Sequence, residues 1–131
     1  MTEYLLGEVV DFIGGGTPDK SKAEFWNGDI PWASVKDFKS TALIVTKDKI
    51  SNVGLNSSAS NLIPAGSVLI PTRMAVGKAA INSIPVAINQ DIKALKPRID
   101  IDNTYLLYLM LSLYFTACRQ VPNIAYEFFS K

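Results

Sequence analysis

Turn-forming residues recur through the first two-thirds of this 131-residue chain and separate short runs of apolar residues. Residues 14–18 contain three glycines and a proline, and an Asn-Gly pair follows at residues 27–28. Both patterns are typical of turns. The short runs between these turns are rich in β-branched and apolar residues, which predicts strands. We expect strands at residues 8–13, 30–33, 42–46, 67–72, 78–82 and 92–95.

Two prolines refine this picture. Pro31 lies inside the run at residues 30–33 and cannot donate a backbone hydrogen bond, so we expect this strand at a sheet edge. Pro64 belongs to an Ile-Pro-Ala-Gly segment at residues 63–66, which predicts a turn leading into the next strand.

The chain changes character near its end. Asn103 and Thr104 can each cap a helix, and neither glycine nor proline follows before Pro122. We therefore expect one long helix at about residues 103–119. It is apolar nearly all round, so it is either buried or half covered by something outside the chain. Many short, mostly antiparallel twisted strands with one late buried helix indicate an α+β fold, in a single domain spanning residues 1–131.

Composition excludes several classes of function. Apolar residues make up 48% and charged residues 19% of the chain, which supports a folded core. The net charge is +1, so any nucleic-acid-binding surface must be local. The absence of histidine removes the usual general base and the commonest zinc ligand, and the single Cys118 cannot form an internal disulfide. The most apolar segment is shorter than the roughly 20 residues that span a bilayer. We expect a cytoplasmic protein without a cofactor.

One charged pattern points to an enzyme. Asp19 follows a proline, and Asp37 and Lys39 come later at the spacing of nucleases that use two carboxylates and a lysine. In such a site the carboxylates hold Mg²⁺ while the lysine steadies the attacking water or the phosphate charge. Charged loops also produce so short a pattern by accident, and both interpretations stay open.

Basic and aromatic residues are interleaved in the window at residues 20–49. The window holds six lysines against four acidic residues, with Phe25, Trp26, Trp32 and Phe38 among them. Lysines neutralise DNA phosphates, although a solvated lysine face and a tryptophan core would leave the same pattern.

Two later stretches carry side chains that can read bases. Arg73 and Lys78 stand at either end of a tight segment, and Asn89 and Gln90 precede a predicted strand. Arginine, asparagine and glutamine suit bidentate contacts with guanine and adenine. The alternative is that Asn89 and Gln90 simply cap a turn.

Several segments together resemble a known family. They are Gly-Gly-Thr-Pro at residues 15–18, Phe-Trp-Asn-Gly-Asp-Ile-Pro-Trp at 25–32, and the stretches at 62–70, 72–78 and 87–95. Over residues 5–118 the chain resembles the target recognition domains in the DNA specificity subunits of Type I restriction–modification systems. The resemblance implies a non-catalytic module that reads one half of a bipartite site in double-stranded DNA. Methylation and cleavage would belong to partner methyltransferase and restriction subunits.

The resemblance also suggests roles for individual residues. We expect phosphate contacts from Lys20, Lys22, Lys36 and Lys39, and groove contacts from Arg73, Lys78, Asn89 and Gln90. Backbone turns are expected at Gly15, Gly16 and Gly77, and packing roles for Trp26, Ile30 and Trp32.

The chain also departs from the family pattern. We expect a single recognition domain without the closing segment and the conserved spacer helix that would follow it. A helix that has lost its cover would self-associate, here through residues 105–115. A truncated or vestigial protein-interaction domain with little DNA affinity is therefore a second hypothesis.

Overall fold

The computed structural model describes residues 10–72 and 77–120, and the side chains of the last helix as far as residue 112. Its strands are β1 (Val10–Ile13), β2 (Ile30–Ala33), β3 (Ala42–Leu43), β4 (Asp48–Ile50), β5 (Leu62–Ile63), β6 (Val68–Pro71), β7 (Ala80–Asn82), β8 (Val86–Ile88) and β9 (Ile92–Pro97). Its helices are the short η1 (Ala23–Phe25), η2 (Val35–Asp37) and α2 (Asn52–Asn56), and the long α3 (Asn103–Gln120).

The strands form two sheets. The five-stranded sheet has the order β1-β9-β6-β7-β3, and the four-stranded sheet has the order β4-β2-β8-β5. The pairings β2–β8 and β3–β7 are parallel, and the other five are antiparallel. The α+β prediction, with mostly antiparallel strands and one late helix, is confirmed.

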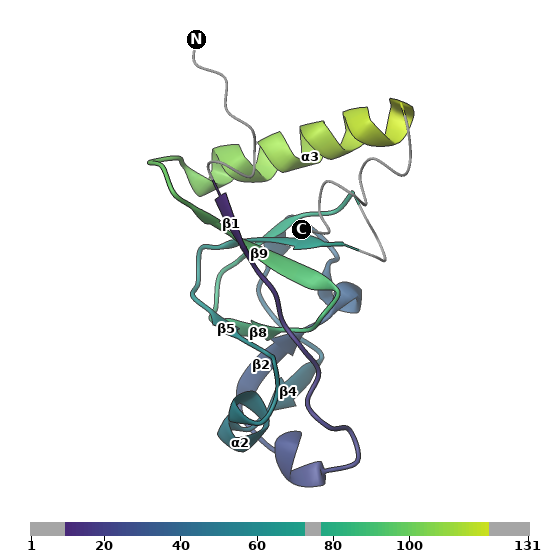
Figure 1. Ribbon diagram of the computed structural model, residues 1–131, viewed down its shortest axis with the longest axis vertical. Helices are drawn as coiled ribbons and strands as arrows, with labels where there is room; N and C mark the ends of the chain where they lie inside the picture. The colour runs from purple at the N-terminus through teal and green to yellow at the C-terminus, as the bar shows by residue number, and fades with distance from the viewer. Residues whose placement is uncertain (1–9, 73–76, 121–131) are drawn as a thin grey trace.

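These elements stack in layers, with α3 at one end of the molecule and α2 at the other (Figure 1). Leu106 of α3 and Val68 of β6 belong to a buried cluster on one face of the five-stranded sheet. Leu69 of β6 and Ile88 of β8 belong to a second cluster, which joins the two sheets. A third cluster around Trp32 draws on the four-stranded sheet and on α2.

The alternation of side chains along a strand explains why β6 and β8 are wholly apolar. Successive side chains point to opposite faces, and both faces of these strands are covered. In β8, Val86 and Ile88 enter the cluster between the sheets, whereas Ala87 packs with Trp32. Every residue of both strands is buried.

The strand predictions are mostly confirmed, with one clear error. β2 is not an edge strand, because it lies between β4 and β8. The ladder between β2 and β8 includes only Trp32 and Ala33 of β2, and Pro31 is paired only with β4. The central strand therefore accommodates a proline, because Pro31 lies outside the ladder with β8. The predicted strand at residues 42–46 ends at Leu43, and β4, β5 and β8 were not predicted.

The late helix is confirmed, but its burial is one-sided. Leu106, Leu107 and Met110 are buried, whereas Tyr105 and Tyr108 are 61% and 60% exposed. The capping side chain is Asp102, whose Oδ1 accepts hydrogen bonds from the backbone N–H groups of residues 104 and 105, rather than Asn103 or Thr104. Within the described residues no helix has the length and hydropathy needed to cross a membrane.

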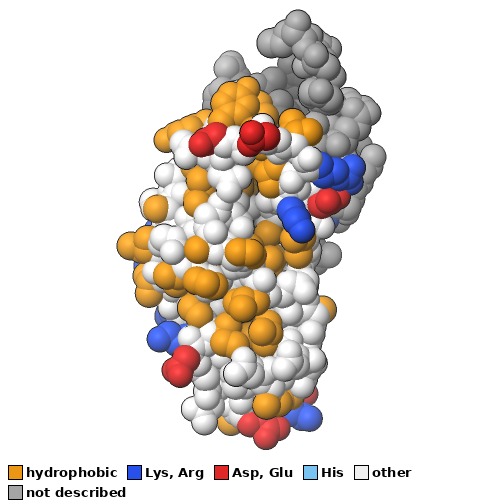
Figure 2. Space-filling view, turned by 90° about the vertical axis from the view of Figure 1, so that its left-hand side faces the viewer, with side chains coloured by type: hydrophobic (Ala, Val, Ile, Leu, Met, Phe, Trp, Pro, Cys, Tyr) orange, Lys and Arg blue, Asp and Glu red, His pale blue; other side chains and the backbone are white. Residues whose placement is uncertain are grey.

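Charge is distributed locally over the surface. On the face shown in Figure 2, hydrophobic side chains form a band across the middle, and charged side chains lie mostly toward the two ends. Basic and acidic side chains occur near one another there.

Candidate nucleic-acid interface

The glycine-rich loop between β1 and η1 is tied to the end of β8. Gly16 N donates to Ile88 O at 3.1 Å, and the Trp32 indole Nε1 donates back to Gly16 O at 3.2 Å. The Trp26 indole Nε1 donates to Asp19 O at 3.1 Å. Both tryptophans therefore pack in the fold and also hold the loop in place.

Close approach of backbones explains the glycines in this loop. A Cβ on Gly15 would lie 2.1 Å from Ile88 O, and one on Gly16 would lie 2.8 Å from the Cβ of Ala59. Neither glycine needs a positive φ. Gly77 differs, since its φ of 106° is in the left-handed region that favours glycine.

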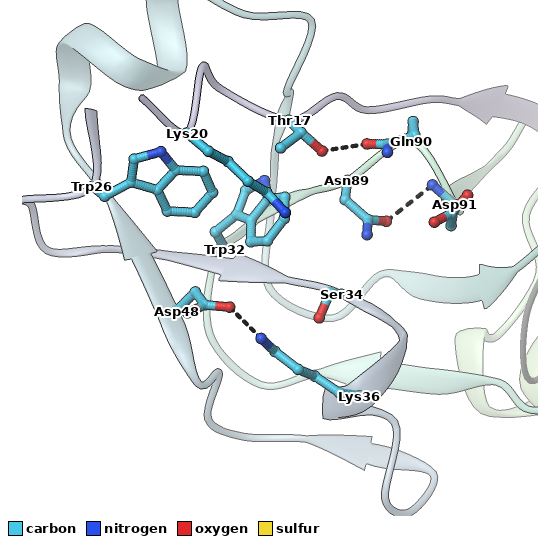
Figure 3. A pocket seen from close by; sticks show the side chains of 10 residues that line it. All are labelled: Thr17, Lys20, Trp26, Trp32, Ser34, Lys36, Asp48, Asn89, Gln90 and Asp91. Carbon is cyan, nitrogen blue, oxygen red and sulfur yellow. Dashed lines mark hydrogen bonds and ion pairs between the residues drawn. The ribbon is translucent and has the colours of Figure 1, made fainter. Parts of the chain in front are cut away.

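A cleft of about 460 Å³ opens beside this loop (Figure 3). We call it the tryptophan cleft, and it is lined by Thr17, Lys20, Trp26, Trp32, Ser34, Lys36, Asp48, Asn89, Gln90 and Asp91. The two indoles meet edge to face, with ring centroids 5.0 Å apart. Ser34 Oγ is buried and has no hydrogen-bond partner within the described residues. The cleft thus offers a half-buried aromatic edge, amides and cations.

Charge in the tryptophan cleft is partly compensated. Lys36 Nζ forms an ion pair with Asp48 Oδ2 at 2.6 Å, and the carboxylate raises the pKa of Lys36. Both side chains are partly exposed, so this pair can open at little cost when a polyanion approaches. Lys20 extends over the cleft from the glycine-rich loop (Figure 3).

The neighbouring amides Asn89 and Gln90 have different environments. Asn89 is only 7% exposed, and its Oδ1 accepts a hydrogen bond from Asp91 N at 3.0 Å. It therefore caps the turn between β8 and β9, as one of the two interpretations predicted. Gln90 is exposed, and its Oε1 accepts a hydrogen bond from the Thr17 hydroxyl. That bond orients the Gln90 amide while leaving its nitrogen free of any bond within the described residues.

Two further hollows share lining residues with each other, and the larger one also shares Lys36 with the tryptophan cleft. The loop hollow, about 720 Å³, is lined by Lys36, Asp37, Lys39, Ser40, Ala42, Ile44, Val45, Thr46 and Lys47. A smaller hollow of about 220 Å³ is lined by Phe38, Lys39, Ser40, Thr41, Gly77, Lys78, Ala79 and Leu111. Lys36 lines both the tryptophan cleft and the loop hollow, and Lys39 lines both the loop hollow and the smaller hollow. We refer to the three together as the basic tract.

Six of the eight predicted contact residues lie along the basic tract. They are Lys20, Lys36, Lys39, Lys78, Asn89 and Gln90. Lys22 lines none of the three hollows, and its Nζ lies 5.5 Å from the centroid of the Phe25 ring. Arg73 lies outside the described residues.

Sequence reasoning missed the apolar part of the tract. Ile44 and Val45 were expected inside a strand, but they line the loop hollow and are 65% and 68% exposed. Lys47 was counted only toward the charge of its window. The available signal was a pair of β-branched residues set between lysines.

The two carboxylates of the nuclease pattern both serve local structure. Asp19 Oδ1 accepts hydrogen bonds from the backbone N and the hydroxyl of Ser21, which lower the pKa of Asp19. Asp37 accepts from Ser34 N and Lys47 N, each at 2.9 Å. Within the described residues no group of three or more His, Cys, Asp or Glu side chains could hold a metal ion. The nuclease hypothesis gains no support.

Comparisons with known proteins agree on one family. The family model described as Type I restriction modification DNA specificity domain matches residues 1–127. The specificity subunit of the Type I restriction enzyme EcoR124I/EcoR124II from Escherichia coli is 39% identical over 110 residues, covering 80% of this chain and 27% of that protein. The MjaIX specificity subunit from Methanocaldococcus jannaschii is 31% identical over 107 residues, covering 79% and 24%.

Solved structures show the same fold. The HsdS subunit from Thermoanaerobacter tengcongensis matches with a TM-score of 0.64 and 27% identity, over 86% of this chain and 27% of that chain. A chain from work on complex assembly and conformational transition of the type I R-M system matches with a TM-score of 0.65 and 27% identity, over 88% and 28%. The present chain spans about a quarter of the length of the curated relatives it matches.

Proposed function

This chain belongs to the Type I restriction modification DNA specificity domain family, and from that premise we propose that it is a non-catalytic module for sequence-specific recognition of double-stranded DNA. It reads one half of a bipartite target. Methylation and cleavage are the work of methyltransferase and restriction subunits of the same system, with which a full-length specificity subunit assembles. The names of its relatives, which are specificity subunits of Type I restriction enzymes, support this assignment.

One observation carries the proposal, namely the continuity of the basic tract. Three hollows that share Lys36 or Lys39 as lining residues carry five lysines against three aspartates, Asp37, Asp48 and Asp91, although the whole chain is nearly neutral. A DNA strand presents phosphates at regular intervals, so a path of cations suits it better than an isolated charge does. We therefore place the DNA backbone along this tract.

The adjacent amides divide their roles in this proposal. Asn89 positions the turn, because its oxygen is already bonded and the side chain is nearly buried. Gln90 reads a base edge, because it is exposed and Thr17 orients its amide. Glutamine pairs well with the N6 and N7 positions of adenine in the major groove.

The proposal also covers the extent of the domain, its cellular location and its self-association. Residues 1–131 act as one recognition domain, which requires access to DNA and hence a cytoplasmic location. The exposed face of α3, with Tyr105 and Tyr108, joins a second copy of the chain when no other partner covers it. Light scattering at rising concentration tests this last step, and a constant monomer mass would overturn it.

Selection from a randomised duplex pool tests the main proposal. The chain is mixed with the pool at low and physiological salt, and the retained DNA is sequenced. We expect an enriched motif of ~3–5 base pairs. Gln90→Ala should relax one position of that motif, whereas Lys96→Gln should leave it unchanged, because Lys96 is exposed and lines none of the three hollows. Retention without an enriched motif would refute sequence recognition, and no retention at either salt would favour the protein-interaction hypothesis.

A further inference from the structure

The connection between β3 and β4 exposes two large apolar side chains side by side. Ile44 is 65% and Val45 is 68% exposed, while the flanking Leu43 and Thr46 are 1% and 6% exposed. The chain therefore leaves the core after Leu43 and returns to it at Thr46. Two large apolar side chains are therefore available to a ligand at this point.

Hydrogen bonds behind this pair hold the connection in shape. The Thr46 hydroxyl donates to Asp48 O at 2.8 Å, and Lys47 N donates to Asp37 Oδ1 at 2.9 Å. The other oxygen of Asp37 accepts from Ser34 N at 2.9 Å, which links the connection to the end of β2. Ile44 and Val45 are thus presented by a braced segment, which lowers the entropy that a ligand must remove on binding.

The charges around the pair identify the ligand as a polyanion. Lys36, Lys39 and Lys47 line the same hollow as Ile44 and Val45. Among the described residues of that lining the only acidic one, Asp37, already accepts two backbone hydrogen bonds. Lys36 is paired with Asp48 at 2.6 Å, a partly exposed pair that can open at little cost. An apolar wall between these lysines fits a polyanion that carries apolar groups of its own. In DNA the group of this kind in the major groove is the C5 methyl of thymine.

The hollow beside this pair can receive a methyl group. Ile44 and Val45 form part of the wall of that hollow, which measures about 720 Å³. Exposed apolar side chains can also wedge between base pairs, and a 2-aminopurine probe distinguishes that contact from the one proposed here.

We propose that Ile44 and Val45 form an apolar contact with thymine methyl groups of the bound DNA, and so make the recognised half-site depend on A·T pairs. The inference rests on the proposed DNA recognition. It adds a contact that the lysines and Gln90 do not provide. The enriched motif must then contain at least one A·T pair.

Replacing thymine with deoxyuridine in the enriched duplex tests the contact, because it removes the methyl group and leaves base pairing intact. Wild-type protein should lose affinity by about three- to fivefold for each contacted methyl, the effect of transferring one methyl group from an apolar contact to water. The double variant Ile44→Ala, Val45→Ala should bind both duplexes equally, at about the affinity of wild type for the deoxyuridine duplex. Val53→Ala is the matched control, since Val53 is 55% exposed and lines none of the three hollows.

The possible outcomes distinguish failure of the methyl contact from failure of DNA recognition itself. Salt-dependent binding with no effect of deoxyuridine in wild type would overturn the methyl contact and leave DNA recognition intact. The methyl contact is overturned in the same way if the double variant still responds to deoxyuridine, or if a 2-aminopurine probe reports unstacking instead. Absence of binding to any duplex would overturn both. Thermal unfolding of each variant identifies losses that come from misfolding.

Discussion

Replacing the tract lysines with glutamine, one at a time, should lower the salt dependence of DNA binding in equal steps. A lysine that neutralises a phosphate releases one condensed counterion, so the logarithm of affinity falls linearly with the logarithm of salt concentration. Five lysines line the proposed tract, namely Lys20, Lys36, Lys39, Lys47 and Lys78, and we count each as one phosphate contact. The slope therefore counts phosphate contacts without reference to sequence specificity.

The expected slope follows from that number. Each phosphate contact contributes about −0.9, so five contacts give a slope of about −4.5. Between roughly 50 and 200 mM salt the affinity should then fall by about 500-fold. Lys36 is paired with Asp48 in the free protein, and if that pair stays closed the slope shrinks to about −3.6.

Fluorescence anisotropy of a labelled duplex measures this slope over the same range of salt. Lys20→Gln, Lys39→Gln and Lys78→Gln should each reduce its magnitude by about 0.9. Lys22→Gln and Lys96→Gln serve as controls, because neither residue lines the tract. All five substituted side chains are exposed, so the melting temperatures of four variants should stay close to that of wild type. Lys78→Gln should be slightly less stable, because Lys78 Nζ donates a hydrogen bond to Phe38 O at 3.1 Å.

Two results would refute the reasoning. A slope near zero would mean that lysine–phosphate contacts do not drive binding at all. A full slope that the tract variants leave unchanged, but that Lys22→Gln lowers, would place the DNA on another surface.

Three further predictions concern stability and pH. Gly15→Ala should destabilise the fold by about 1–3 kcal/mol, because the added Cβ would lie 2.1 Å from the backbone oxygen of Ile88. Gly14→Ala should be tolerated, because its added Cβ would meet nothing within 4 Å. Equal urea midpoints for the two variants would contradict this reasoning. Leu106→Ala, at a fully buried position of α3, should cost about 2–5 kcal/mol in the free energy of unfolding by urea, and a loss below about 1 kcal/mol would show that α3 is poorly packed. DNA affinity should stay constant between roughly pH 6 and 9. The lowered pKa of Asp19 keeps this carboxylate charged at still lower pH than usual, and the raised pKa of Lys36 keeps this ammonium charged at still higher pH than usual. Any stability from the Asp19 hydrogen bonds is present above its ordinary pKa and is lost only as pH falls through the lowered value, so a break in affinity near pH 7 would require another group.

The parts of the fold that could be predicted depend on local signals. The late helix follows from an uninterrupted apolar segment, and the turn before β6 follows from Ile-Pro-Ala-Gly, whose Gly66 has a φ of 87°. The position of β2 within its sheet depends on β8, which lies more than fifty residues further along the chain. No local pattern indicates that pairing. The rule that proline occurs in edge strands therefore gave a wrong position for β2. β5 contains only two residues and β8 only three, too few to show a period.

In the candidate site, too, residue types could be predicted from the sequence, whereas the directions of their side chains could not. The sequence predicted that lysines and amides matter, but not which of two neighbours faces the ligand. Lys20 lines the tryptophan cleft while Lys22, two residues later, lies by the ring of Phe25. Asn89 turns inward and Gln90 outward, because the turn between β8 and β9 uses the asparagine oxygen for its own hydrogen bond. These choices are made by packing and hydrogen bonding across the fold, which the spacing of residues does not encode.

The architecture separates residues that hold the site from residues that face the ligand. Trp32, Gly16 and Asn89 bond to the backbone of neighbouring segments, so their replacement disturbs the frame. Gln90 and Ile44 are largely exposed on segments that this frame holds, so their replacement changes the contact surface and little else. Substitutions that retain the first group and vary the second should therefore change the recognised sequence without loss of stability. A recognition module built in this way can acquire a new target by a few exposed substitutions, because the folding energy resides elsewhere.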